Sequence, residues 1–436
     1  MEIVIVALFA VLFFILRISK LDSLSSVTLM VFYLYWFIQL ILSQFRIHDV
    51  YMPSILSTFY LMIGVISFSI GYYTIKIKPV DIQNYKYNVI DKLKGSIDSL
   101  VDKKWFQLVL VGTAIYIVSL DVYFFDAIAA GAFIRTEGIS MVEYYGPTFA
   151  KLNTYLLCWY IPLMRPIFCY CLLYRRKWYL PFMALLLLGF EILSGGRIGL
   201  IRTFIPILLI IGLFRINKGY KFKPKQIVAF SLIAVGIYYG IIALTAFRAG
   251  TTDFSSAVND GRDLTNDAFV TYFVGPAVAF DQVIHSNIID VTGGIKFGLN
   301  VLWPLFFPIL VVLYIAGVTN YINGPAGAVS DFLQFNYLSV GTGSKWNALY
   351  TWNVDFYCDA GIIGIIVFNF LFGYLMRYCF KWMYNKGTVY NLIIVSFVFV
   401  IVLQAPIKLY GMFNLLPILI YVLLYFHSVE AKRLYQ

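Results

Sequence analysis

Histidine and cysteine are scarce in this sequence, and the few that occur are scattered. The three histidines are His48, His285 and His427, and they stand too far apart in the chain to suggest a metal cluster. The five cysteines lie in or beside apolar runs and form no Cys-x-x-Cys pair. This usage argues against a zinc site and against a disulfide framework, and we expect neither a metal nor another cofactor.

Charge and nucleotide-binding motifs are also sparse. Only 13% of the residues are charged, against about 25% in soluble domains. The chain has no GxxxxGK[ST] loop, which argues against an ATP-driven motor, and no GxSxG nucleophile turn. The net charge of +11 invites a nucleic-acid interpretation, but the basic residues sort to one side of the predicted membrane topology, so we expect no nucleic-acid partner.

Apolar residues are abundant instead, because 61% of the 436 residues are hydrophobic. A soluble core could not hide that much apolar surface, whereas a bilayer can, and about 20 helical residues cross its hydrocarbon core. The sequence therefore predicts an all-α polytopic membrane protein of about 11 transmembrane helices. The predicted spans are 2–17, 25–43, 52–74, 105–121, 152–174, 178–193, 198–214, 227–247, 358–376, 388–404 and 412–427.

The basic residues predict the orientation of these spans. Most of the 33 Lys and Arg residues fall in the loops 75–104, 175–177, 215–225 and 377–386 or near Arg17 and Lys20, which places these segments in the cytoplasm. The chain begins Met-Glu without a basic region before its first apolar run, which favours a retained first helix over a cleaved signal peptide. We thus expect an external N-terminus and a cytoplasmic C-terminus.

One apolar stretch, 298–317, does not fit as a span. A single crossing there would turn the basic loop 377–386 outward, and Pro304 and Pro308 would break a straight helix. We interpret 298–317 as re-entrant or interfacial. Residues 248–357 then form one large external segment with short re-entrant or interfacial helices, inside a single integral membrane domain covering 1–436.

Polar groups inside a membrane are costly and mark candidate functional residues. Ser194-Gly195-Gly196-Arg197-Ile198-Gly199-Leu200-Ile201-Arg202 predicts a tight external turn, with Glu191 just before it. The guanidinium groups of Arg197 and Arg202 suit a phosphate or diphosphate. The alternative is a turn whose arginines reach lipid headgroups.

Three further arginines are candidates. Arg165 lies mid-span between two prolines and should face the protein interior, where the alternative to function is an internal salt bridge, with Glu191 as a candidate partner. Arg248 stands where a predicted span leaves the membrane, and Arg262 lies nearby in the external segment. The alternative for both is an ordinary solvated loop charge.

Residues 345–364 combine aromatic rings with amides and carboxylates, as sugar binding requires. Lys345, Asn347 and Tyr350 are candidate binding residues, and Asp355 and Asp359 are candidate catalytic groups. The alternative is an aromatic belt at the membrane interface, which would account for the rings but not for the two aspartates.

In these motifs the chain resembles the Wzy-type O-antigen or oligosaccharide repeat-unit polymerases of bacteria. The resemblance rests on the eleven-span plan, the SGGRIGL turn, the FRAG exit followed by TYFVGPAVAFDQ, and the segment NALYTWNVDFYCDAGIIG. It implies transfer of a growing glycan from undecaprenyl diphosphate to the non-reducing end of a second lipid-linked unit, without a metal, at the outer face of the bacterial inner membrane.

The resemblance also implies roles for these residues. Fixed positive charge would stabilise the leaving diphosphate, a role carried over to Arg197 and extended by position to Arg165, Arg202 and Arg248. The candidate bases are Asp355, Asp359, Glu191 and His285, and the residues do not choose among them. Arg135 and Arg262 are further candidate contacts to substrate. Donor and acceptor would both be undecaprenyl-diphosphate-linked oligosaccharides, and a polysaccharide chain-length regulator is an expected partner.

Two other functions share many of these features. An O-antigen ligase would use the same donor and differ in its acceptor, which is the lipid A core. A transporter of lipid-linked oligosaccharide would be expected to show an internal repeat and helices broken near the membrane midplane. No internal repeat is visible in the sequence, and the external segment is large.

Overall fold

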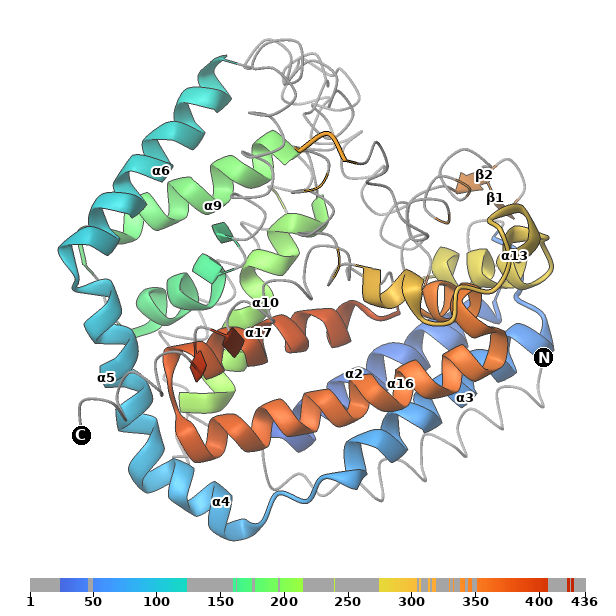
Figure 1. Ribbon diagram of the computed structural model, residues 1–436, viewed down its shortest axis with the longest axis horizontal. Helices are drawn as coiled ribbons and strands as arrows, with labels where there is room; N and C mark the ends of the chain where they lie inside the picture. The colour runs from blue at the N-terminus through green and yellow to red at the C-terminus, as the bar shows by residue number, and fades with distance from the viewer. Residues whose placement is uncertain are drawn as a thin grey trace. The chain divides into compact units, whose positions relative to one another are not determined.

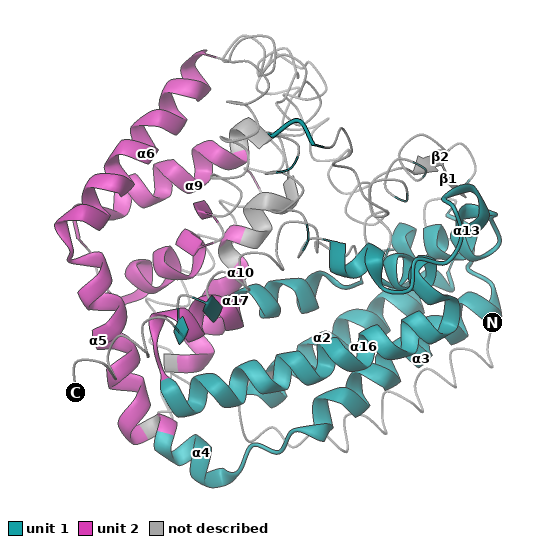
Figure 2. Ribbon diagram, viewed as in Figure 1, with its two compact units in different colours: residues 1–84, 269–386, 397–436 teal, residues 85–268, 387–396 magenta. Residues whose placement is uncertain are grey.

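The structure is a computed structural model that describes residues 24–45, 50–123, 160–161, 163–174, 177–194, 197–214, 274–303, 338–341, 344–346 and 351–406, with short pieces elsewhere. The chain divides into two compact units (Figure 2). Unit 1 comprises residues 1–84, 269–386 and 397–436, and unit 2 comprises residues 85–268 and 387–396. The single membrane domain stays a prediction.

Helices make up nearly all of the described structure (Figure 1). Unit 1 contains α2 (Leu24–Ser43), α3 (Ile55–Thr74), α4 (Pro79–Asn84), α13 (Ile288–Val291), α16 (Asn353–Lys386) and an apolar helix over Val274–Ile284. Unit 2 contains the π-helix η2 (Tyr85–Val89), α5 (Ile90–Val101), α6 (Lys104–Tyr123), α9 (Leu180–Ser194), α10 (Arg197–Phe214) and a helix over Leu163–Tyr174. The helix α17 (Val389–Gln404) contributes residues to both units.

Three of the described helices, α3, α6 and α16, are long and apolar enough to cross a membrane, which identifies a membrane protein. The bounds of α2, α3, α6, α9, α10 and α17 lie within a few residues of the predicted spans. Outside the described residues lie 2–17, most of 227–247 and of 412–427, and half of 298–317. The number of crossings stays a prediction.

The segment 75–104 was predicted to be a loop, and that prediction is wrong. It forms α4, η2 and α5. In α5 the buried side chains are Ile90, Leu93, Ile97 and Val101, spaced three or four residues apart, so one face of the helix packs against the protein. Lysines interspersed along this segment obscure that narrow apolar stripe in the sequence.

The long helices α3 and α16 pack backbone to backbone in unit 1. A Cβ added at Gly71 would lie 2.0 Å from the carbonyl oxygen of Phe370, and one added at Gly373 would lie 2.0 Å from that of Phe68. The long part of α16 runs in the same direction as α3, because Gly64 approaches Asn369 while Tyr72 meets Arg377 about two turns further along both helices. This relative direction is the one that the sequence predicts for these two spans.

The helix α16 is broken after its second turn. Ala360 and Gly361 leave the helical region, and Gly361 has φ +60° and ψ −141°, a conformation that glycine adopts without a Cβ penalty. Phe356 stacks on Phe368 with ring centroids 5.4 Å apart, although twelve residues of straight helix would separate them by about 18 Å. Residues 353–359 therefore fold back along the long part of α16, and the predicted span 358–376 misses this short helix.

A small β-hairpin is an exception to the all-α prediction. Strands β1 (Leu338–Gly341) and β2 (Ser344–Trp346) pair antiparallel, with Leu338 opposite Trp346 and an irregularity between Ser339 and Gly341. Gly341 also forms an isolated bridge with Val50. The hairpin lies within the segment 248–357, and its few residues do not alter the helical class of the fold.

Arg377 of α16 forms hydrogen bonds at the C-terminal end of α3. Its guanidinium donates hydrogen bonds to the Tyr72 hydroxyl at 2.7 Å, to the Ser25 hydroxyl at 2.5 Å and to the carbonyl oxygen of Ile75 at 3.3 Å. Ile75 is the C-cap of α3, so the positive charge of Arg377 also interacts favourably with the negative end of that helix dipole.

Candidate functional site

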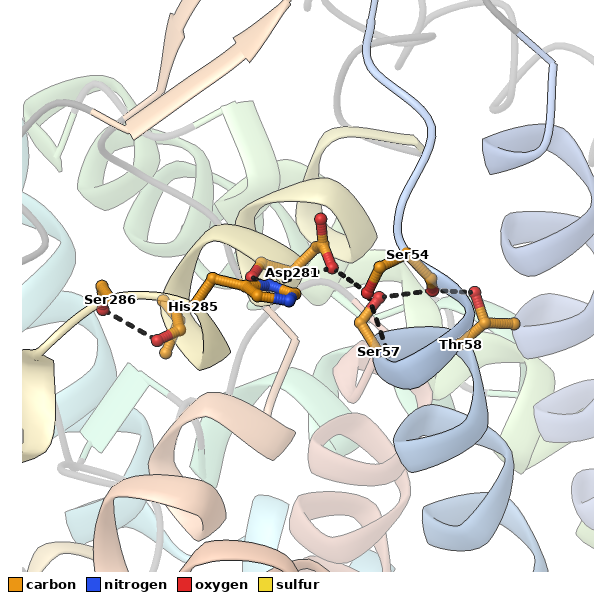
Figure 3. Close-up of polar contacts among 7 residues, drawn as sticks. Ser54, Ser57, Thr58, Asp281, His285 and Ser286 are labelled. Atoms are coloured by element: carbon orange, nitrogen blue, oxygen red, sulfur yellow. Dashed lines mark hydrogen bonds and ion pairs between the residues drawn. The ribbon is translucent and has the colours of Figure 1, made fainter.

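Asp281 connects the apolar helix 274–284 to the first turn of α3 (Figure 3). Its carboxylate accepts a hydrogen bond from the Ser54 hydroxyl at 2.5 Å. Ser54 is the N-cap of α3, and its hydroxyl oxygen also accepts the Ser57 backbone N–H at 3.2 Å. Serine is favoured at this position because it satisfies an otherwise orphan N–H of the first turn. The serine is thereby fixed in place and holds the buried aspartate.

His285 stands one helical turn beyond Asp281. Its Nδ1 lies 2.8 Å from the backbone carbonyl oxygen of Asp281 and 3.4 Å from the Asp281 carboxylate. Since both oxygens are acceptors, Nδ1 is the donor in these contacts, which leaves Nε2 as the ring nitrogen whose lone pair can accept a proton. The His285 side chain is 55% exposed, against 13% for Asp281, and Nε2 has no hydrogen-bond partner among the described residues.

This arrangement can accept a proton from a bound molecule. The carboxylate of Asp281 would stabilise the imidazolium that forms when Nε2 takes the proton. The order of contacts differs from a serine-hydrolase triad, because Asp281 lies between Ser54 and His285. The Ser54 hydroxyl donates to the carboxylate and does not face an imidazole nitrogen that could activate it. We therefore assign Ser54 a positioning role and not that of a nucleophile.

Asp359, a predicted catalytic residue, is completely buried and holds a neighbouring turn. Its two carboxylate oxygens accept the backbone N–H groups of Asn300 at 2.8 Å and Val301 at 2.9 Å. Its own carbonyl oxygen accepts the N–H of Phe297 at 2.9 Å. These bonds satisfy the free N–H groups at the start of a short helical turn. Both oxygens are thus engaged with backbone, which favours a structural role for this carboxylate.

Asp355 lies one turn earlier in the same short helix and is partly exposed. The Asn300 side-chain amide donates to its carboxylate at 3.2 Å and to its carbonyl oxygen at 3.1 Å. Asp355, Asp359 and His285 all belong to unit 1. Of the four candidate bases in the sequence, His285 has an exposed side chain and a ring nitrogen, Nε2, that no described residue occupies.

Arg165 and Glu191 form a buried ion pair in unit 2. The guanidinium Nη2 lies 2.5 Å from Glu191 Oε1, and the two side chains are 11% and 3% exposed. The Thr203 hydroxyl donates to the same carboxylate at 3.4 Å, which joins α9 to α10. The salt bridge considered as the alternative for Arg165 is therefore present.

The remaining predicted residues are placed only in part. Arg197 is the first residue of α10 and Arg202 lies one turn and a half later, while Lys345 lies in β2, and the side chains of all three fall outside the described structure. The other predicted site residues lie outside the described residues altogether: Arg135, Arg248, Arg262, Asn347 and Tyr350. Within the described part of the chain no group of His, Cys, Asp or Glu residues is suited to hold a metal.

Sequence reasoning missed Asp281 and Ser54. Asp281 is four residues before His285 in a helical segment, and this spacing predicts two side chains on one face. Ser54 gave no comparable signal, because it is 227 residues from Asp281 in the chain. Comparison with protein-family models, with curated proteins and with solved structures finds no match to this chain.

Proposed function

We propose that this protein is a membrane glycosyltransferase that polymerises lipid-linked oligosaccharide repeat units. It would transfer a growing glycan from undecaprenyl diphosphate to the non-reducing end of an incoming lipid-linked unit, at the outer face of the bacterial inner membrane. The proposal includes about 11 spans, a periplasmic N-terminus, a cytoplasmic C-terminus and the external segment 248–357. A polysaccharide chain-length regulator is the proposed protein partner.

The observation that carries this proposal is the exposed His285 imidazole held by Asp281. In the proposed step, the acceptor hydroxyl oxygen forms a bond to the anomeric carbon of the donor glycan. The bond from that carbon to the diphosphate oxygen breaks, and the leaving group takes the electron pair as undecaprenyl diphosphate. The hydroxyl proton passes to Nε2 of His285, and the Asp281 carboxylate balances the new charge. This step needs neither a metal nor another cofactor.

The leaving diphosphate gains negative charge, and guanidinium groups stabilise such charge when they are fixed in a site that excludes water. We assign this role to Arg197, with Arg202 and Arg248 as further contributors. Arg165 is already paired with Glu191, so it would act by positioning α9 and α10. Asp355, Lys345, Asn347 and Tyr350 are proposed contacts to the sugar.

The test uses the full chain, purified and reconstituted into nanodiscs, with lipid-linked repeat units as both donor and acceptor. A ladder of glycans that differ by one repeat unit is the expected product. Folded protein that forms no ladder from its cognate unit contradicts the proposal. Transfer to a lipid A core acceptor, without a ladder, would instead identify a ligase.

Substitutions at the dyad test the mechanism separately from the fold. We expect His285→Gln to lower the turnover rate by about 10²- to 10⁴-fold, the usual contribution of a general base, and Asp281→Asn to lower it as well. The matched control is Asp290→Asn, which changes an exposed carboxylate of α13 and should leave the rate unchanged. Normal turnover in a folded His285→Gln variant would remove His285 from the mechanism.

A second candidate function, transport of a lipid-linked oligosaccharide, is favoured by the break in α16. Transporters use helices that are discontinuous within the membrane. In this case proteoliposomes should move a fluorescent lipid-linked oligosaccharide from one leaflet to the other, without forming a longer glycan. Equal movement in liposomes with and without the protein would contradict this alternative.

A further inference from the structure

Residues 295–302 of unit 1, which we call the apolar turn, present large apolar side chains on the surface of the protein. Phe297 is 85% exposed, and Ile295, Leu299 and Leu302 are each more than 40% exposed. Scattered single apolar residues on a surface need no explanation, but four within eight residues form a patch. Such a patch indicates a contact with a membrane or with another protein.

Contacts with α16 place the apolar turn near the level of the middle of α3. A Cβ added at Gly298 would lie 3.2 Å from the ring of Phe368. A Cβ added at Gly64, near the middle of α3, would lie 3.0 Å from the side-chain nitrogen of Asn369, the residue after Phe368. Since α3 is long and apolar enough to cross a membrane, its middle belongs in the hydrocarbon core. The apolar turn therefore reaches that depth beside α16.

The chain that leads into the apolar turn starts at the end of α3. Asp281 is hydrogen-bonded to Ser54, the N-cap of α3 (Figure 3), and Asp290 follows with an exposed side chain. The one charged residue of the apolar turn is Lys296, and its ammonium group donates to the carbonyl oxygen of Thr292, back toward these aspartates in the chain. The segment thus passes from a carboxylate level with the end of α3 to apolar side chains level with its middle.

The backbone N–H groups of residues 297 and 299–302 all have acceptors within the chain. The Phe297 N–H donates to the Asp359 carbonyl oxygen at 2.9 Å. The Asp359 carboxylate accepts two more, from Asn300 at 2.8 Å and from Val301 at 2.9 Å. The other two donate to carbonyl oxygens three or four residues earlier, at 3.0 and 2.9 Å. Hydrocarbon offers no partner to an unpaired backbone group, whereas water does, so this complete pairing suits a turn in lipid.

The neighbouring surface of α16 favours lipid over a protein as the cover of the apolar turn. Ile363, Ile366 and Val367 precede Phe368 and are each more than 40% exposed, on a helix that is long and apolar enough to cross a membrane. The apolar turn packs beside this stretch and continues its apolar surface.

We propose that residues 295–302 dip into the bilayer from the side on which α3 begins, and that their exposed side chains contact phospholipid acyl chains. Asp359 is then the internal acceptor that allows this turn to remain in hydrocarbon. The predicted external segment 248–357 would include a part immersed in lipid. This inference does not depend on the proposed reaction.

Spin labels attached to single introduced cysteines test this placement, with the full chain in nanodiscs made only of phosphatidylcholine and phosphatidylglycerol. Phe297→Cys and Leu302→Cys put the label on the apolar turn, and both replace exposed side chains, so both variants should fold. Ile366→Cys on α16 is the matched reference for lipid, and Asp290→Cys is the reference for water. The described native cysteines are buried, and the chain without an introduced cysteine measures their background labelling.

The measurement is the collision rate of each label with molecular oxygen, which concentrates in the bilayer, and with a neutral nickel chelate, which stays in water. We expect the oxygen-to-nickel ratio at 297 and 302 to match that at 366 and to exceed that at 290 severalfold. Because these nanodiscs contain no polyprenyl lipid, that result assigns the contact to phospholipid acyl chains. Nickel access equal to that at 290 would place the turn in water and overturn the proposal. Exclusion of both reagents would overturn it in favour of a protein cover, such as a second copy of the chain.

Discussion

Replacing Glu191 with glutamine leaves the guanidinium of Arg165 buried without a carboxylate. The two side chains are only 11% and 3% exposed, so water can replace the lost partner to a small extent only. Removing one member of a buried ion pair costs about 3–5 kcal/mol, whereas replacing both members by apolar residues is often neutral or stabilising. We therefore expect Glu191→Gln to destabilise the protein by about 3–5 kcal/mol, and Arg165→Met combined with Glu191→Leu to cost far less.

The free energy of unfolding in detergent, measured against a denaturant series, checks this expectation. The matched control is Lys177→Met, which breaks the Lys177–Asp102 pair of the same unit, whose side chains are 45% and 42% exposed. An exposed pair contributes about 0–1 kcal/mol, so the control should have a small effect. A cost of Glu191→Gln no larger than that of the control would contradict the expected burial penalty. The double variant, assayed for glycan polymerisation, then separates a structural pair from a functional one.

Three other substitutions, one of them with a control, have expected outcomes. Gly373→Ala forces α3 and α16 apart and should lower the free energy of unfolding by about 1–3 kcal/mol or more. The control is Gly112→Ala in α6, where an added Cβ meets nothing within 4 Å. This change should be neutral or stabilising by up to about 1 kcal/mol. Gly361→Ala places a side chain at φ +60° and should cost about 1–3 kcal/mol in the same measurement; no loss would mean that the break is not formed as described. Asp359→Ala removes the acceptors of two backbone N–H groups, and amide hydrogen exchange at 300 and 301 should become faster, while unchanged exchange would contradict the capping role.

The apolar helices were predictable because their signal is local. A run of about 20 apolar residues is sufficient to place α3 or α6, and the bounds found differ from the predicted ones by a few residues. The break in α16 was not predictable in the same way, because Gly361 by itself is equally typical of close helix packing. Its conformation follows from the fold-back of Phe356 onto Phe368, which is a tertiary contact.

The candidate site was predictable where its residues are close in the sequence or where a charge is isolated in a span. The Arg165–Glu191 pair could be anticipated, since a mid-span arginine needs a partner and few acidic groups are at the same depth. His285 was found as a titratable group in the external segment, but its support by Asp281 and Ser54 depends on how α3 meets another helix. Asp359 was predicted as a catalytic group within a segment suited to sugar binding, and its hydrogen bonds to two backbone N–H groups depend on how residues 300 and 301 pack against it.

The glycine contacts between α3 and α16 have a mechanical consequence for unit 1. Where two backbones touch at Gly71 and Gly373, no flexible side chain lies between them to absorb a displacement. The helix α3 and the long part of α16 should therefore move as one rigid body. The short arm 353–359 is held to the same body, because a Cβ added at Gly364 would lie 2.0 Å from the carbonyl oxygen of Phe356, so Asp355 and Asp359 keep a fixed position relative to both helices.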